Sequence, residues 1–252
     1  MLTIIKFFVK INQRCSIFFA KYLPQTKPFI IDIYNKTVAS YANAKRNQTI
    51  IDAGCGTKTT FVKFCKTSIN NKIIGIDLSI NAFENKDVDE VIITNLETDL
   101  PFSENSIDII SSSSVVEHLK DVETFVKNCS LILKPGGIFI NLFSNRYAPF
   151  ALLNYLLPEK ISRKLLYFFR ESMRTKRRYR VYYNKCTYNQ FNQLLQKYNF
   201  EMVNTYFNYY QSFYFDFFFP LFIASAIYEI ILSAVKNKNL CSHMIIIAKK
   251  IK

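Results

Sequence analysis

Two acidic residues, each placed where an apolar run ends, are the first in this sequence with an evident chemical use. Asp52 belongs to Ile-Asp-Ala-Gly-Cys-Gly at 51–56, and Asp77 ends Ile-Ile-Gly-Ile-Asp at 73–77. Glycines at a strand-to-helix turn permit unusual backbone angles and let a ligand approach the main chain. The helix that we expect after Gly56 would offer free amides and its positive dipole end to an anionic group.

The second acid narrows the class of ligand. In nucleotide-binding sheets, an acid at the position of Asp77 accepts hydrogen bonds from both ribose hydroxyls. A carboxylate favours a bare ribose diol there and repels a 2′-phosphate. Each feature also has a structural alternative, because two glycines can form an ordinary turn and an aspartate can cap a helix.

The elements that must position these acids form an α/β pattern. From residue 49 onward, strand-like apolar runs alternate with helix-length segments, which is typical of a parallel, doubly wound sheet. The predicted strands are 49–53, 72–77, 90–95, 107–112 and 138–144, followed after a gap by 201–207 and 242–249.

Two helices are marked by their ends. One follows Asp121 over 122–133 and is closed by Lys-Pro-Gly-Gly at 134–137. The other follows Thr187, which can cap free amides while Gln190 reaches back, as in a capping box. The apolar residues that then fall on one helical face are Phe191, Leu194, Leu195 and Tyr198.

The length and composition of the chain limit the number of domains and the classes of partner that it could have. The chain has 252 residues and a formal net charge of +14, so it suits one elaborated domain with anionic partners: nucleic acid, a membrane surface or a phosphorylated substrate. Its six cysteines have no paired spacing and it has two histidines, so we expect no metal site and reduced, cytosolic thiols. Lysines interrupt the apolar N-terminus, which fits a surface-seeking or lid-forming helix better than a signal peptide.

Six short motifs occur in one order. They are Asp-Ala-Gly-Cys-Gly at 52–56, Gly-Ile-Asp at 75–77, Leu-Pro-Phe at 100–102, Asn-Ser-Ile-Asp at 105–108, Val-Val-Glu-His-Leu at 115–119 and Leu-Lys-Pro-Gly-Gly at 133–137. With them the sequence resembles class I S-adenosylmethionine-dependent methyltransferases of the UbiE/type-11 group, closely over 48–145 and loosely elsewhere. The resemblance implies a Rossmann-like α/β sheet, mostly parallel, with the last strand antiparallel.

The resemblance also implies a site for S-adenosylmethionine. Gly54 and Gly56 would line its methionine part, Asp52 would hold its amino group through water, and Asp77 would bind its ribose. The remaining implied cofactor contacts are Ala53 beside the glycines, Leu78 against the adenine, Asn95 and Leu96 at the adenine edge, and Ser111 and Ser112 at the amino-acid end.

Two positions depart from the family pattern. Lys58 stands where the glycine loop usually has a small residue, and it could pair with the cofactor carboxylate or point to solvent. Asn95 stands where an aspartate is usual, and its side-chain carbonyl can still accept from the adenine amino group. Catalysis in the family is mainly alignment of a methyl group with its acceptor. If a base is needed, His118 is the candidate near the site, with Glu117 as the alternative, because His243 falls in the last strand.

Three segments lie outside the alternation. We expect a helical lid segment at 1–48, and a methyltransferase domain at 49–252 with helical or apolar inserts at 146–186 and 208–240. The apolar stretch 213–235 is long enough for a membrane span, but its two carboxylates and a proline favour a pocket-covering or interfacial helix. A basic cluster ends the first insert: Arg170, Arg174, Lys176, Arg177, Arg178 and Arg180.

These features favour methyl transfer to a small-molecule, lipid-linked or glycan acceptor. We expect a cytoplasmic protein, peripheral on the inner face of a membrane with anionic lipids. One alternative is an RNA methyltransferase, disfavoured because the fourth strand ends in four serines at 111–114 and no RNA-binding module flanks the core. Another is a non-catalytic S-adenosylmethionine-binding protein in a biosynthetic complex, which Lys58 and Asn95 leave open.

Overall fold

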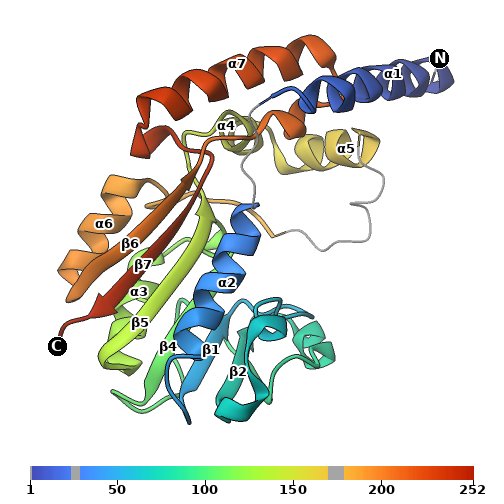
Figure 1. Cartoon of the computed structure of the whole chain (residues 1–252). Helices are drawn as coiled ribbons and strands as arrows, with labels where there is room; N and C mark the ends of the chain where they lie inside the picture. The colour runs from blue at the N-terminus through green and yellow to red at the C-terminus, as the bar shows by residue number, and fades with distance from the viewer. Residues whose placement is uncertain (1, 24–28, 170–178) are drawn as a thin grey trace.

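The computed structural model describes residues 2–23, 29–169 and 179–252. Its centre is a seven-stranded sheet in the order β3-β2-β1-β4-β5-β7-β6 (Figure 1). The strands are β1 (Thr49–Ala53), β2 (Lys72–Asp77), β3 (Glu90–Ile93), β4 (Ile107–Ser113), β5 (Leu133–Ser144), β6 (Phe200–Asn208) and β7 (His243–Lys250). β7 pairs antiparallel with both β5 and β6, whereas the pairs among β1 to β5 are parallel. The predicted mixed sheet with an antiparallel last strand is thereby confirmed.

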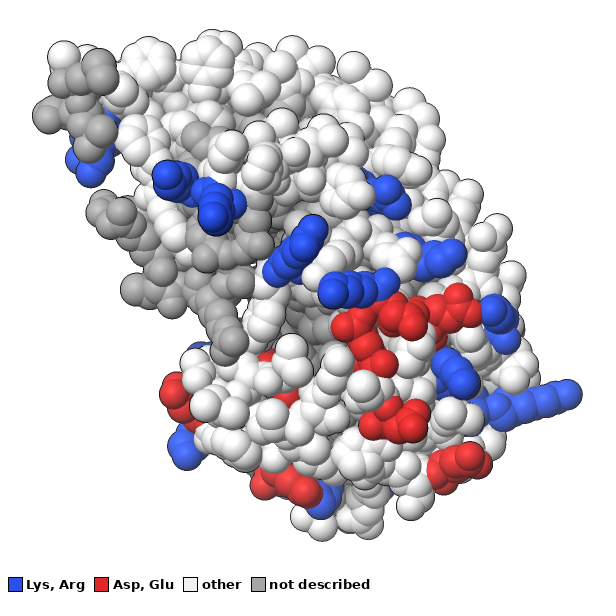
Figure 2. All heavy atoms as spheres, turned by 180° about the vertical axis from the view of Figure 1, so that it is seen from behind, with Lys and Arg blue, Asp and Glu red and all other residues white. Residues whose placement is uncertain are grey.

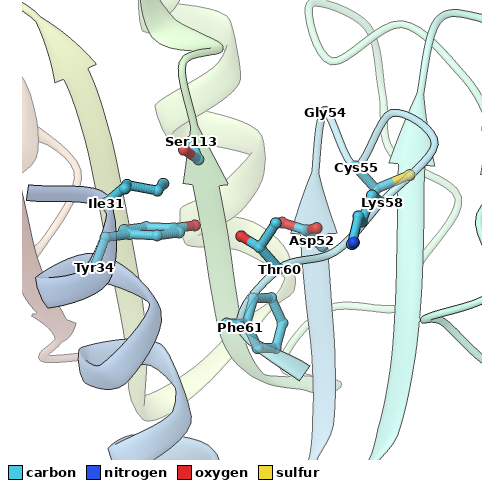
Figure 3. A pocket seen from close by; sticks show the side chains of 9 residues that line it. All are labelled: Ile31, Tyr34, Asp52, Gly54, Cys55, Lys58, Thr60, Phe61 and Ser113. Atoms are coloured by element: carbon cyan, nitrogen blue, oxygen red, sulfur yellow. The ribbon is translucent and has the colours of Figure 1, made fainter. Parts of the chain in front are cut away.

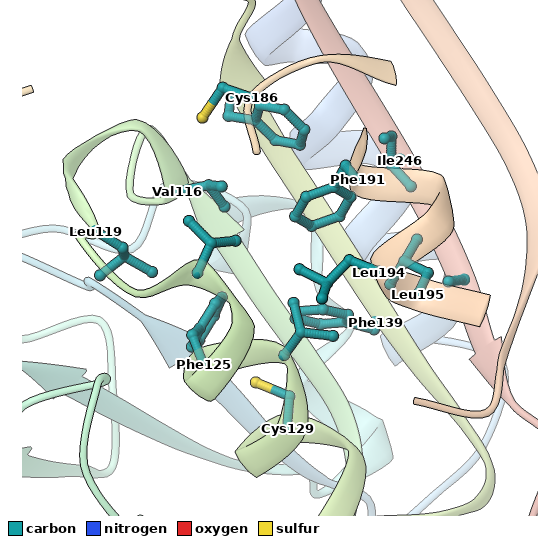
Figure 4. Packing of buried hydrophobic residues seen from close by; sticks show 14 of the residues in the cluster. Val116, Leu119, Phe125, Cys129, Phe139, Cys186, Phe191, Leu194, Leu195 and Ile246 are labelled. Carbon is teal, nitrogen blue, oxygen red and sulfur yellow. The ribbon is translucent and has the colours of Figure 1, made fainter. Parts of the chain in front are cut away.

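Helices cover both faces of the sheet. On one face, α2 (Ile30–Ala42) buries Tyr34, Val38 and Ala42 against apolar residues of β1, β4, β5 and β7. On the other, α3 (Val122–Ile132) and α6 (Tyr188–Lys197) pack on Phe139 and its neighbours (Figure 4). The spacing of four residues along α2 keeps its buried side chains on one face.

The expected helix after Gly56 is wrong. Between β1 and β2 the chain forms two 3-10 turns, η1 (Val62–Phe64) and η2 (Thr67–Ile69), and η3 (Ile80–Glu84) follows β2. Hydroxyls explain the loop: Thr59 donates to Asp52 Oδ2 at 2.8 Å and Thr60 donates to Asn35 Oδ1 at 2.8 Å. Such side-chain bonds compete with helix formation. A helix N-terminus therefore does not face the site from this segment.

The Lys-Pro-Gly-Gly segment at 134–137 belongs to β5 and does not form a separate turn before it. Its Lys134 Nζ lies 2.8 Å from Asp108 Oδ2, which also accepts from Thr49 N at 2.9 Å. Both partners come from the motifs of the sequence, yet they meet where β1 begins. These two motifs therefore stabilise the end of the sheet where β1 begins, which is opposite to the end where the glycine turn and Asp77 lie.

Four further helices gather beyond the end of the sheet where β5 finishes (Figure 1). They are α1 (Leu2–Ala20), α4 (Pro149–Leu156), α5 (Glu159–Phe169) and α7 (Phe219–Val235). Three further 3-10 turns are η4 (Val116–His118), which follows β4, and η6 (Ser212–Phe215) and η7 (Lys238–Leu240), which stand before and after α7. Of the basic cluster, Arg180 is described, whereas the members from Arg170 to Arg178 lie outside the described residues. None of the described helices has the length and apolarity needed to cross a membrane.

The start of α6 follows its predicted mechanism with one change. Thr187 Oγ1 accepts from Gln190 N at 3.3 Å, and the Gln190 side chain meets the Thr187 hydroxyl at 3.2 Å in place of the Thr187 amide. Phe191, Leu194 and Leu195 are buried, as expected from their spacing.

We expect Thr187→Ala to lower the free energy of unfolding by about 1 kcal/mol, because the amide of the first helical turn loses its acceptor. Urea unfolding followed by circular dichroism measures the change. Thr187→Ser keeps the hydroxyl and should lose much less. Equal losses in the two variants would instead assign the effect to packing of the buried methyl group.

Candidate functional site

The turn after β1 requires glycine. Gly54 has φ +73°, and a Cβ there would lie 2.3 Å from Val115 Cγ2. Its amide donates to Ile76 O at 2.7 Å, and Gly56, with φ +52°, donates to Asp77 Oδ2 at 2.9 Å. The turn therefore presents a bare main chain that is fixed by hydrogen bonds to the neighbouring strand.

Asp77 holds two loops in place. Its Oδ2 accepts from Gly56 and its Oδ1 accepts from Ser79 N at 2.8 Å. An ionised carboxylate has about four acceptor positions, so these two bonds leave capacity for a ligand hydroxyl. Leu78, next in the chain, is 63% exposed beside a buried acid, and this placement suits an apolar ring lying over it.

Asp52 is buried at the end of β1. Thr59 Oγ1 donates to its Oδ2 at 2.8 Å, and Ser111 Oγ lies 3.3 Å from its Oδ1. Burial raises the pKa of Asp52 to about 7, the two hydroxyls oppose the rise, and the charge of Asp77 adds to it. A cation placed beside this carboxyl group would favour its ionised form.

A cavity of about 210 Å³ opens between the β1 turn and α2 (Figure 3). Its lining residues are Ile31, Tyr34, Asp52, Gly54, Cys55, Lys58, Thr60, Phe61 and Ser113. Lys58 thus lines the cavity even though its side chain is exposed. Burial raises the pKa of the Cys55 thiol to about 12, so it is neutral at ordinary pH.

Tyr34 is one of the lining residues that the sequence did not single out. Its ring points from α2 toward Asp52 and Thr60 (Figure 3), and its buried hydroxyl has no hydrogen-bond partner of ordinary geometry in the described part of the chain. Burial raises the pKa of this phenol well above its usual range, the charge of Asp52 adds to the rise, and the nearby Ser111 hydroxyl opposes it. A buried hydroxyl without a partner is costly, so its position at the cavity favours a polar ligand. The apolar repeat of Tyr34, Val38 and Ala42 was the signal that could have placed α2 here.

The serines that end β4 point to different sides. Ser111 and Ser112 are fully buried: Ser111 faces Asp52, whereas Ser112 donates to Asn141 Oδ1 at 2.6 Å on β5. Ser113 lines the cavity, although the sequence pointed to its two predecessors. Ala53 is also fully buried and packs in the core that α3 covers.

The predicted adenine-edge residues follow β3. Asn95 Oδ1 accepts from Glu97 N at 3.0 Å, so its side-chain carbonyl already has one partner. Leu96 is 7% exposed and packs into the core. Asn95 can therefore offer a second lone pair or its amide hydrogens, and Leu96 shapes the loop from beneath.

Glu117 and His118 lie on η4, just after β4, and do not line the cavity. Glu117 Oε1 accepts from Ser144 Oγ at 2.7 Å, while its buried Oε2 has no partner in the described residues. Burial raises the pKa of Glu117, and a positive charge on His118 would oppose the rise. His118 Nδ1 lies 2.9 Å from Arg180 O, so Nδ1 carries the proton in the neutral ring and Nε2 is the acceptor.

His243 lies nearer to Glu117 and His118 than the sequence implied, at the end of the sheet where β5 finishes. Because β7 runs antiparallel, its first residue pairs with Ser144, the last residue of β5. The imidazole stacks on Phe150 with ring centroids 5.2 Å apart, and burial lowers its pKa to about 4. His118 is therefore not the sole histidine at this end of the sheet, but His243 is neutral and packed among aromatic rings.

Comparisons with known proteins agree with this geometry. A family model described as a methyltransferase domain matches residues 51–141. The mitochondrial ubiquinone biosynthesis O-methyltransferase of Homo sapiens is 30% identical over 139 residues, which cover 50% of this chain and 37% of that protein. The chain thus spans well under half the length of this relative.

Two solved structures share the fold. A putative methyltransferase in complex with the Haloferax volcanii Trm112 activator has a TM-score of 0.55 at 13% identity, covering 87% of this chain and 90% of that one. Geranyl diphosphate C-methyltransferase from Streptomyces coelicolor A3(2), solved with S-adenosyl-L-homocysteine, has a TM-score of 0.51 at 13% identity, covering 87% and 79%. Residues 51–141 thus match a methyltransferase domain, and the chain shares the Rossmann-like fold of these solved methyltransferase structures.

Proposed function

We propose that this protein transfers a methyl group from S-adenosylmethionine to a small-molecule acceptor at the carboxyl ends of β1, β4 and β5. One observation carries the proposal: the paired acids Asp52 and Asp77 flank a bare glycine turn that is already held in shape. The cofactor, when bound, supplies an electrophilic methyl group on a cationic sulfur.

The residues present fit that cofactor. Asp77 can accept from a ribose diol with its remaining lone pairs, and Asp52 can stabilise a cationic amino group. The Tyr34 hydroxyl, which has no hydrogen-bond partner among the described residues, can donate to a carboxylate or accept from an amino group in the cavity, and Lys58 supplies a cation at its edge. A cavity of about 210 Å³ suits the amino-acid end of the cofactor, with the adenosine over exposed Leu78.

The acceptor end would lie near η4. Glu117 has a raised pKa and a buried oxygen without a partner among the residues that the structure describes, and His118 has its tautomer fixed by a backbone carbonyl. Either could take a proton from an acceptor hydroxyl, whereas the low pKa of buried His243 makes it a weak base. We propose Glu117 and His118 as the candidates for this role.

The finer identity of the acceptor is also a proposal. The curated relative is named for ubiquinone biosynthesis and a structural neighbour holds geranyl diphosphate, so both names point to amphipathic small molecules. They support a lipid-linked acceptor over a glycan or RNA. We further propose that the protein is cytoplasmic and peripheral on an anionic membrane, where such an acceptor would lie. Lys58 at the cavity, in place of a small residue, keeps a non-catalytic S-adenosylmethionine-binding protein as the second candidate.

We expect Asp77→Asn to weaken S-adenosylmethionine binding by about 1–3 kcal/mol, because a charged acceptor of the ribose is lost. Isothermal titration calorimetry measures the affinity. Glu84→Gln removes a nearby exposed charge and should bind as the wild type does. Tight binding of a nicotinamide dinucleotide in place of S-adenosylmethionine would contradict the proposal.

We expect S-adenosylmethionine affinity to rise with pH between about pH 5.5 and 7, where free Asp52 is largely protonated. A cationic amino group beside Asp52 lowers its pKa on binding, so the complex forms with release of protons. Calorimetry in buffers of different ionisation enthalpy measures that release. It should vanish in Asp52→Asn and persist in Asp99→Asn, which alters an exposed acid; proton release that is unchanged in Asp52→Asn would contradict this role for Asp52.

A further inference from the structure

We infer that the outward face of α1 is a membrane-binding surface that inserts apolar side chains into a bilayer containing anionic lipids. The inference deepens the proposed function, on which it rests for its purpose, because it names the surface through which a lipid-linked acceptor would arrive. The binding itself can be measured without catalysis.

Polar contacts fix which face of α1 points outward. Asn12 Oδ1 accepts from Phe219 N at 2.8 Å, at the start of α7, and Ser16 Oγ donates to Asp216 O at 3.0 Å. The Phe19 and Phe219 rings lie 5.0 Å apart between the same helices. Val9, Asn12 and Ser16, at spacings of three and four residues, are therefore buried, and α1 cannot rotate without losing these bonds.

The opposite face of α1 is apolar and open. The spacing of its members places them on one stripe of the helix, and they are 44–72% exposed. They are Ile4, Phe7, Phe8, Ile11 and Phe18. Large apolar side chains gathered in this way on a soluble surface mark an interaction site, because leaving them in water is unfavourable.

Cations run beside this stripe. Lys6, Lys10 and Arg14 recur every four residues and are exposed, and α1 contains no acidic residue. On the face of the molecule shown in Figure 2, lysines and arginines lie in both halves, whereas the acidic side chains lie in the half away from α1 and α7. An apolar stripe bordered by cations is the arrangement of helices that lie in the plane of an anionic bilayer.

α7 packs beside α1 at the same end of the molecule (Figure 1) and adds exposed apolar residues there. Its carboxylate, Glu229, is buried and accepts from Gln211 N at 2.8 Å and Ser225 Oγ at 3.1 Å. The carboxyl group of α7 thus points into the protein, whereas Ile227, Ile231 and Val235 are exposed. A protein partner would need specific polar contacts, but this surface offers an apolar stripe bordered by cations, which the headgroup region of an anionic bilayer matches.

Tryptophan fluorescence tests the inference sharply, because the chain has no tryptophan. Phe18→Trp places one on the stripe, and Leu131→Trp places one at an exposed site on α3. With vesicles of phosphatidylcholine and phosphatidylglycerol, emission should shift to the blue for the first variant and stay unchanged for the second. No shift for Phe18→Trp at low salt, or equal shifts for both, would overturn the inference.

Flotation with the same vesicles measures the separate contributions of the cations and of the apolar stripe. The triple variant Lys6→Gln, Lys10→Gln, Arg14→Gln, which alters exposed side chains alone, should lower the partition coefficient roughly a hundredfold. The triple Phe7→Ser, Ile11→Ser, Phe18→Ser should lower it at least about tenfold. The matched triple Leu131→Ser, Val203→Ser, Ile251→Ser changes exposed apolar residues elsewhere and should float as the wild type does.

Each result separates this inference from the proposed function. Variants that keep S-adenosylmethionine affinity but no longer float support a membrane role for α1. If the stripe variants float like the wild type, or if they convert a dimer into monomers without altering flotation, the surface has another use and the inference fails. If the wild-type protein does not bind S-adenosylmethionine, the proposed function is wrong, whereas the flotation result still stands.

Discussion

The site depends on hydrogen bonds that tie the ends of β1 and β2 together. Ile76 O accepts from Gly54 N and Cys55 N at 2.7 and 3.1 Å, and the Asp77 carboxylate accepts from Gly56 N. Gly75 is part of the same arrangement, because a Cβ there would lie 2.7 Å from Cys55 Sγ. The glycine turn thus takes its shape from the next strand, without the expected helix behind it. Preorganised acceptors of this kind lower the entropic cost of binding a ligand.

The sequence predicted the sheet well because its strands carry local signals. β1 and β2 have the predicted bounds, and the remaining strands differ by a few residues at their ends, most at β5, which begins at Leu133. The motif pair formed by Asp108 and Lys134 shows why motifs in register need not all touch a ligand. Their ion pair and the hydrogen bond to Thr49 stabilise the end of the sheet that is opposite to the site. Some of the shared motifs therefore stabilise the fold and do not contact a ligand.

Long-range features could not be predicted in this way. Tyr34 reaches the cavity because α2 docks across a sheet that forms later in the chain, and four consecutive serines give no clue that Ser113 lines the cavity while Ser112 faces Asn141. His243 reaches the edge near Ser144 because the last strand reverses direction. In each case pairing between distant segments, and not local propensity, decides which side chain meets the site.

We propose that this chain moves a methyl group from S-adenosylmethionine to a small amphipathic molecule. Incubation of the purified protein with methyl-tritiated S-adenosylmethionine and a cell extract, followed by separation of lipid, RNA and protein fractions, tests it most directly. We expect tritium in the organic-soluble fraction, with little in RNA or protein. Label confined to RNA, or no transfer by a protein that binds the cofactor, would contradict it.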